Sequence, residues 1–189
     1  MVFKLVGNPM TQAHADDFWT WSLAHYRRPD AEAQLLALQD RFGCNVNILL
    51  WLCWCAECFE AAPEPVITEA IDAIAGWNAK VTAKLRDVRR YMKTQGADNA
   101  DLRSDVKQAE LDAEKVEQRL LQDLAISALA PAGDDSDDAI QTRARKNLNG
   151  YAALHGAGSQ KGLDAALLHP LIGNILGEPI DGEQGTGNE

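Results

Sequence analysis

One segment constrains the fold of this chain more than any other: residues 48–59, which read ILLWLCWCAECF. On a helix these side chains are apolar nearly all round, and Glu57 is the one charged residue among them. A helix without a polar face belongs in the interior of a bundle. The run is also far shorter than the ~20 residues that a membrane-spanning helix needs. We therefore expect a buried central helix in an all-α bundle of six or seven helices, with no membrane span.

Two shorter helices are expected before this run. Asp16 or Asp17 can cap the first of them, which ends near Tyr26. Trp19 and Leu23 then share one face with that tyrosine, and we expect this face to be the buried one. The second helix begins near Pro29, because proline is favoured in a first helical turn, and ends before Gly43, because glycine is favoured directly after a last turn. Its apolar residues repeat at a 4-3-4 spacing and are Ala31, Leu35, Leu38 and Phe42.

Residues 66–93 and 99–129 have the heptad-like apolar patterns of two longer helices. The turn at 95–98 is short, so we expect the two helices to form an antiparallel hairpin. The apolar stripe expected on the second of them consists of Leu102, Val106, Ala109, Ala113, Val116 and Leu120.

Asn78 occupies a position in the first long helix where the pattern requires an apolar side chain, between Ile74 and Val81. We expect a buried asparagine that fixes the register of the hairpin, as polar residues at such positions do in coiled coils. Two alternatives remain open. Asn78 hydrogen-bonds a neighbouring polar group of the bundle, or the helix bends at Gly76 and Asn78 reaches solvent.

These patterns predict one helical domain over residues 14–155. It comprises an N-terminal trio of helices at 14–61, the hairpin at 66–130 and a sixth helix at 136–155. We expect a loose arm at 1–13, a loop with a short helix at 156–176 and a disordered acidic tail at 177–189.

The chain is acidic, with a formal net charge of −10 at pH 7. That balance disfavours non-specific binding to nucleic acid. The chain has four cysteines and shows no recognisable secretory signal, so we expect a cytosolic protein with reduced thiols.

Cys53, Cys55 and Cys58 have a spacing that invites a metal or redox interpretation. Successive residues of a helix turn by ~100°, so Cys53 and Cys55 point about 160° apart and cannot hold one ion. We therefore expect buried structural thiols, no metal and no cofactor. The sequence also lacks metalloprotease, nucleophile-elbow and phosphate-loop motifs, which makes an enzyme the less favoured interpretation.

A dense basic run stands out in so acidic a chain: Lys84, Arg86, Arg89, Arg90 and Lys93. The facing helix is rich in acids, and opposite charges commonly pair across such hairpins. The alternative is a docking patch for an acidic partner.

A block of residues between positions 18 and 56 is similar to a sequence pattern of a known family. Its members are Phe18, Trp19, Tyr26, Leu35, Leu36, Leu38, Gln39, Asp40, Gly43, Val46, Asn47, Leu49, Leu50 and Trp54. Residues 18–56 thereby resemble an uncharacterised proteobacterial family of short cytosolic proteins. The hairpin agrees more loosely, and the region after about residue 130 hardly matches. The family has no assigned activity, so the resemblance implies a fold and a compartment but no mechanism.

The block directs attention to four polar residues around the turn between the second and the central helix: Gln39, Asp40, Asn45 and Asn47. Asn45 can cap the central helix. The four residues either cap and lock this turn against the first helix or form a small polar pocket beside the tryptophans. Glu57 is either a buried carboxylate or the point where its helix reaches the surface. The candidate ligand or interaction residues are Trp19, Trp21, Tyr26, Gln39, Asp40, Asn45, Asn47, Trp54 and Glu57.

The sequence lacks a nucleophile–base pair and has a long charged hairpin. We therefore expect a non-catalytic cytosolic interaction or adaptor protein with a protein partner, and homo-oligomerisation stays open. The alternative is a helical bundle, or a minor enzyme, that binds a small ligand at the polar turn of residues 39–47.

Overall fold

The computed structural model describes residues 17–96, 99–133, 135–158 and 162–177. Over these residues the fold is all-α, as the sequence predicts, and none of them belongs to a β-strand. The loose N-terminal segment expected at 1–13 lies outside the described residues, and so does the expected tail beyond Gly177. The elements in chain order are α2 (Phe18–Tyr26), α3 (Ala31–Phe42), α4 (Val46–Cys58), α5 (Glu64–Trp77), the π-helix η1 (Asn78–Thr82), α6 (Ala83–Thr94), α7 (Ala100–Ala128), α8 (Asp137–Gly158), the 3₁₀-helix η3 (Ala165–Leu167) and α9 (Pro170–Leu176).

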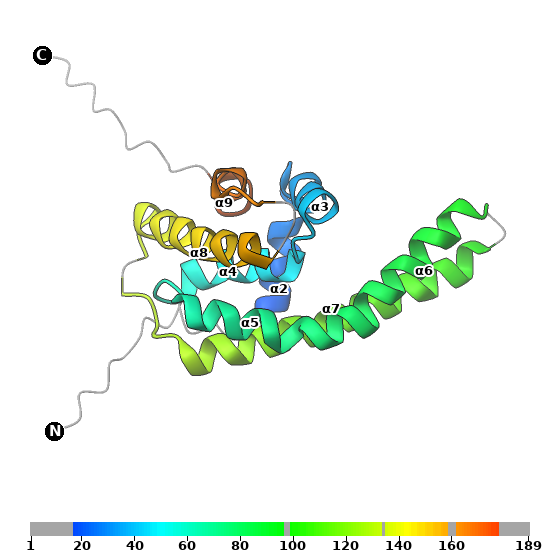
Figure 1. The fold of residues 1–189 in the computed structure, drawn as a ribbon, viewed down its shortest axis with the longest axis horizontal. Helices are drawn as coiled ribbons and strands as arrows, with labels where there is room; N and C mark the ends of the chain where they lie inside the picture. Colours follow the sequence, from blue (N-terminus) through cyan, green and yellow to red (C-terminus); the bar gives the residue numbers. More distant parts are fainter. Residues whose placement is uncertain (1–16, 97–98, 134, 159–161, 178–189) are drawn as a thin grey trace, which may run out of the picture.

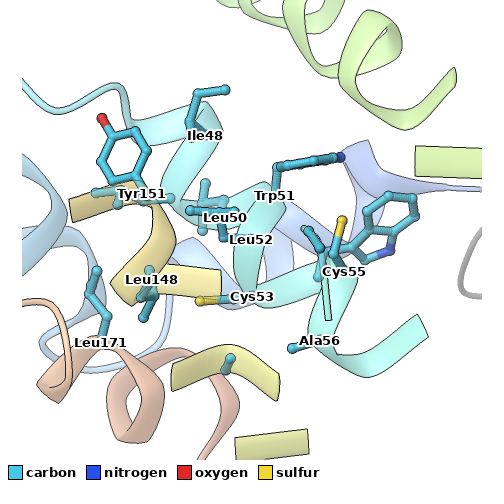
Figure 2. Close-up of a cluster of buried hydrophobic side chains, with 14 of the residues drawn as sticks. Ile48, Leu50, Trp51, Leu52, Cys53, Cys55, Ala56, Leu148, Tyr151 and Leu171 are labelled. Carbon is cyan, nitrogen blue, oxygen red and sulfur yellow. The ribbon is translucent and has the colours of Figure 1, made fainter. Parts of the chain in front are cut away.

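We name as the body the part of the molecule that comprises α2–α5, α8, α9 and α7 from residue 113 onwards (Figure 1). Helix α4 lies at its centre, packed against α2, α3, α7, α8 and α9. Every residue from Asn47 to Ala56 is buried, which confirms the prediction from its apolar sequence. Figure 2 shows Leu148 of α8 and Leu171 of α9 among the side chains that surround it. Neither α4 nor any other helix in the described part of the chain is long and apolar enough to cross a membrane.

The predicted helix ends near α4 are also confirmed. Asp17 caps α2, because its Oδ1 accepts a hydrogen bond from the Thr20 amide at 2.9 Å. Asn45 caps α4 in the same way, accepting from the Ile48 amide at 3.1 Å. Gly43 ends α3 with a φ of +74°, a left-handed conformation that favours glycine.

The predicted buried face of α2 is wrong. The buried residues are Phe18, Trp21 and Ser22, whereas Trp19 and Leu23 are only partly buried. The reason is an aromatic contact: Phe18 stacks on Trp54 of α4 with ring centroids 5.0 Å apart. Both faces of α2 carry large apolar side chains, so the periodicity alone cannot choose between them.

The first half of the hairpin is a continuous helical run that passes through a π-helical turn. Its first part, α5, packs against α7 and α8, and its last part, α6, packs against α7. We name α6 together with residues 100–112 of α7 the arm, because the two helices extend together beyond the body (Figure 1).

The apolar stripe predicted on α7 is wrong at Leu102, Ala109 and Leu120, which are exposed, and holds at Ala113, which is buried. The residues that α7 buries are Glu110, Ala113, Glu117, Gln118, Leu121 and Ala125. Three of these are polar, so a search for apolar periodicity selects the wrong face.

Helix α8 closes the other side of the body and comes close to α5. A Cβ atom added to Gly150 would lie 2.9 Å from Cδ1 of Ile67, too close for two carbon atoms. Its apolar residues Ala144, Leu148 and Tyr151 are buried, and Ile140 is partly buried.

Candidate functional site

A cluster of polar side chains lies inside the bundle, where α2, α4, η1 and α7 meet. We name it the buried polar cluster; its members are Ser22, Asn47, Asn78, Thr82, Glu117 and Gln118. Glu117 is 0 % exposed and lies at its centre. Its carboxylate accepts hydrogen bonds from Asn47 Nδ2 at 2.9 Å, Asn78 Nδ2 at 3.0 Å and Thr82 Oγ1 at 2.5 Å.

Gln118 extends this network to α2. Its Nε2 donates to Asn47 Oδ1 at 2.8 Å, and its Oε1 accepts from Ser22 Oγ at 2.9 Å. Four segments of the chain are thereby joined by side-chain hydrogen bonds. A buried polar network of this kind fixes one packing arrangement, because any shift leaves a donor or acceptor unpaired.

Asn78 fits the alternative in which it hydrogen-bonds a neighbouring polar group of the bundle. Its amide is partly buried and donates to Glu117. Thr82, which also donates to Glu117, lies one turn further along the same π-helical segment. Such π-helical turns occur frequently at functional sites.

A cavity of about 350 Å³ lies next to this cluster, bounded by α4, α5, η1 and α8. Asn78 belongs to both, since it also lines the cavity. The lining residues are Gly43, Asn45, Ile48, Ile71, Ile74, Ala75, Asn78, Tyr151, Leu154 and His155.

Two aromatic side chains of α8 form one wall of the cavity. The Tyr151 hydroxyl accepts a hydrogen bond from the Asn45 amide at 3.3 Å, and burial raises the pKa of this phenol. His155 Nε2 lies 2.8 Å from the Phe42 carbonyl oxygen, so this nitrogen is the donor. The two rings stack with centroids 5.4 Å apart.

The four predicted polar residues of the turn do not share one site. Asp40 is exposed and pairs with Arg90 of α6 at 2.9 Å, and Gln39 is partly buried. Asn45 caps α4 beside the cavity, whereas Asn47 points into the buried polar cluster.

None of the predicted aromatic residues lines the cavity. Trp54 is fully buried, and Trp19 lies under the Lys115 ammonium with 5.0 Å between nitrogen and ring centroid. Trp21 Nε1 donates to Glu57 Oε2 at 2.6 Å, so the partly buried Glu57 carboxylate holds this indole in place.

Tyr26 lies apart from these groups, at the partly buried end of α2. Burial, together with the nearby Glu32, raises its pKa to about 12. The phenol therefore stays neutral at physiological pH.

The basic run on α6 divides into paired and unpaired cations. Arg86 binds Glu110 at 3.0 Å and Glu114 at 2.9 Å, and Arg89 binds Glu110 as well. Lys84 and Lys93 are exposed and have no ion-pair acceptor within the described part of the chain.

These ion pairs move the pKa values of the two glutamates in opposite directions. Burial acts to raise the pKa of Glu110, but the hydrogen bonds and charges of Arg89 and Arg86 lower it below its usual value. For Glu114 burial dominates over the attraction of Arg86, and its pKa is raised.

The cysteines are buried thiols, and none is paired in a disulfide. Burial raises the pKa of Cys44 to about 11 and that of Cys58 to about 12. Figure 2 shows the side chains of Cys53 and Cys55 leaving different sides of α4, as helical geometry predicts. The described residues contain no group of three or more histidine, cysteine or acidic side chains that could hold a metal ion.

A family model described as "Protein of unknown function (DUF2390)" matches residues 17–121, more than half of the chain. The chain belongs to this family. No curated protein and no solved structure matches it. The DUF2390 match extends well beyond the block at 18–56 and contains all six residues of the buried polar cluster and the whole arm. Tyr151 and His155, which line the cavity, lie outside it.

Sequence reasoning missed Glu117, Gln118 and the cavity residues of α8. One signal was present: Glu117 lies four residues from both Ala113 and Leu121, which are buried. A glutamate at that spacing, with an unexplained Asn78 on the facing helix, indicates a polar contact across the hairpin.

Proposed function

We propose that this DUF2390 protein is a non-catalytic, cytosolic interaction module, and that its arm binds an acidic segment of a protein partner. The observation that carries the proposal is the surface of the arm beyond the body. Tyr91 is 66 % exposed and Leu102 is 59 % exposed, the two highest values among large apolar side chains in the described residues. Val88 on α6 is exposed as well. Exposed apolar side chains gathered on one structural element commonly mark a binding surface.

The charges of the arm support an acidic partner. Helix α6 carries five basic residues and one acid, Asp87. The arginines that face α7 are neutralised by Glu110 and Glu114, whereas Lys84 and Lys93 face solvent. Electrostatic complementarity of this kind selects partners and speeds association.

The buried, unpaired thiols support the proposed compartment. Disulfides are rare in the cytosol, and Cys53, Cys55 and Cys58 are adapted to burial rather than to reaction because their pKa values are raised by desolvation.

The test is site-specific photo-crosslinking in living cells with a photoreactive residue at position 91. Ile126 is the matched control, because it is a large apolar residue of α7, 48 % exposed, outside the arm. We expect a defined cross-linked product from position 91 and none of that mass from position 126. The product should disappear in the double variant Lys84→Glu/Lys93→Glu. A product that persists after this charge reversal, or the same product from both positions, would contradict the proposal.

The cavity favours a second candidate function, the binding of a small ligand. Asn45, one of the polar residues predicted from the turn, contributes to its wall. Ligand sites typically combine apolar walls with a few polar groups, and this cavity has that composition.

A further inference from the structure

We infer that the cavity binds an uncharged small molecule with an apolar body and one hydrogen-bond donor, a hydroxyl or an amide N–H, which Asn78 and His155 recognise. This inference rests on the second candidate function and is independent of the arm.

The walls of the cavity determine the apolar body of the ligand. Ile48, Ile71, Ile74 and Leu154 line it from three helices. Its volume of about 350 Å³ falls within the range of ~300–1,000 Å³ that is common for small-molecule sites. A single aromatic ring or a short alkyl chain fits into such a space.

The lining also indicates that the ligand is uncharged. No lysine, arginine, aspartate or glutamate is among the residues that line the cavity. A carboxylate or phosphate would therefore lose its hydration and gain no cationic partner, which is unfavourable.

Asn78 supplies the first acceptor. Its Nδ2 is committed to the buried Glu117 carboxylate at 3.0 Å, which fixes the orientation of the amide. The other end of the amide is its Oδ1, for which the described residues provide no hydrogen-bond donor. Since Asn78 lines the cavity, this carbonyl oxygen is available to a ligand.

His155 supplies the second acceptor by the same logic. Its Nε2 donates to the Phe42 carbonyl oxygen, so Nδ1 of the neutral ring is left with a lone pair. The Tyr151 hydroxyl already accepts from the Asn45 amide at 3.3 Å, which holds this side chain against the wall of the cavity. The two acceptors, Asn78 Oδ1 and His155 Nδ1, favour a donor on the ligand, and a ligand hydroxyl can also accept from Asn45 Nδ2, which has no hydrogen-bond partner among the described residues.

The test uses three probes of similar size: benzyl alcohol, toluene and benzoate. Each is titrated into the ¹⁵N-labelled full-length protein while amide chemical shifts are followed by NMR. We expect saturable shifts centred on Gly43, Asn45, Ala75 and Asn78 for benzyl alcohol. Toluene should bind about fivefold more weakly, because it forms no hydrogen bond, and benzoate should produce no saturable shift.

Two variants of α5 locate the binding. Ala75→Phe fills the cavity and should abolish the shifts. Ala73→Phe adds the same side chain to an exposed position of α5 that does not line the cavity, and binding should persist. His155→Phe keeps an aromatic ring on Tyr151 but removes the acceptor, so the preference for benzyl alcohol over toluene should shrink towards one.

The outcomes separate the inference from the function on which it rests. If none of the probes gives saturable shifts at the cavity, or if Ala75→Phe leaves the shifts unchanged, both the ligand site and its specificity are wrong. If toluene or benzoate binds as tightly as benzyl alcohol, the cavity is a ligand site but the donor requirement is wrong.

Discussion

The body around α4 and the arm join helices in opposite ways. In the body, α4 is buried along its length by apolar contacts, with Trp51 and Trp54 among the largest side chains that are fully buried. In the arm, α6 and α7 are joined by Arg86 and Arg89, which bind Glu110 and Glu114. Apolar burial is non-directional and does not depend on charge screening, whereas partly exposed ion pairs depend on geometry, pH and ionic strength. The body therefore supplies stability, and the arm can present a charged surface because its own stability relies less on apolar contacts.

The largest expected effect lies in the body. Trp54→Ala removes a fully buried indole that stacks on Phe18 and meets the edge of Phe59, and it should lower the free energy of unfolding by about 4 kcal/mol. Urea titrations at low and high salt measure this, and the loss should be equal in both. Trp77→Ala, at a partly exposed indole of α5, is the control and should lose much less. A loss that salt abolishes would break the distinction between the two regions.

Glu117 lies where body and arm meet. Glu117→Ala leaves the donors of Asn47, Asn78 and Thr82 without an acceptor and should cost about 3 kcal/mol. Glu117→Gln keeps the volume and one acceptor oxygen, so its loss should be smaller. The exposed Glu69→Ala on α5 is the control and should remain within about 0.5 kcal/mol of the wild type. Equal stability of the Glu117→Ala and Glu69→Ala proteins would show that the buried polar cluster contributes nothing.

Asn78→Leu tests the same cluster from the facing helix. Since Asn78 donates to Glu117, the variant leaves one carboxylate oxygen with fewer partners and should unfold about 1–2 kcal/mol more easily. A register device predicts the reverse, a higher melting temperature with mixed oligomers. Thermal unfolding combined with light scattering distinguishes these results, and a rise in melting temperature would contradict the hydrogen-bond interpretation.

The smallest expected effect lies in the arm. The pKa of Glu110 is lowered in the folded protein, so its contribution is present above its ordinary pKa of 4.5 and is lost as the pH falls through the lowered value. Glu110→Gln should therefore cost about 1 kcal/mol at pH 7 and nothing once the pH is well below 4.5. Glu114 is present in both proteins, so the difference reports on Glu110. A loss that does not change with pH would assign the effect to packing instead.

The comparison also explains which parts of the fold the sequence could predict. The burial of α4 was predictable because a segment that is apolar all round needs no particular partner. The caps at Asp17 and Asn45 were predictable because they act on amides three residues away. The buried face of α7 could not be predicted in this way. Glu117 is tolerated in the core because Asn47 donates a hydrogen bond to it, and the two residues are 70 positions apart in sequence. The cavity could not be predicted for the same reason, because Tyr151 of its α8 wall contacts Asn45 from a position 106 residues away in sequence.

The π-helical turn η1 sets the direction in which the arm faces. Each residue of an α-helix advances the side chains by ~100° around the axis, so one residue more or less before α6 changes the phase of everything after it. A π-helical turn holds about one residue more than an α-helical turn, so if the same residues formed an uninterrupted α-helix, α6 would be rotated by about that angle relative to α5. Tyr91, Lys84 and Lys93 would then face another direction, and Arg86 would turn away from Glu110. The orientation of the proposed binding surface is thus encoded in the number of residues of a single turn, while the side chains that form it lie elsewhere.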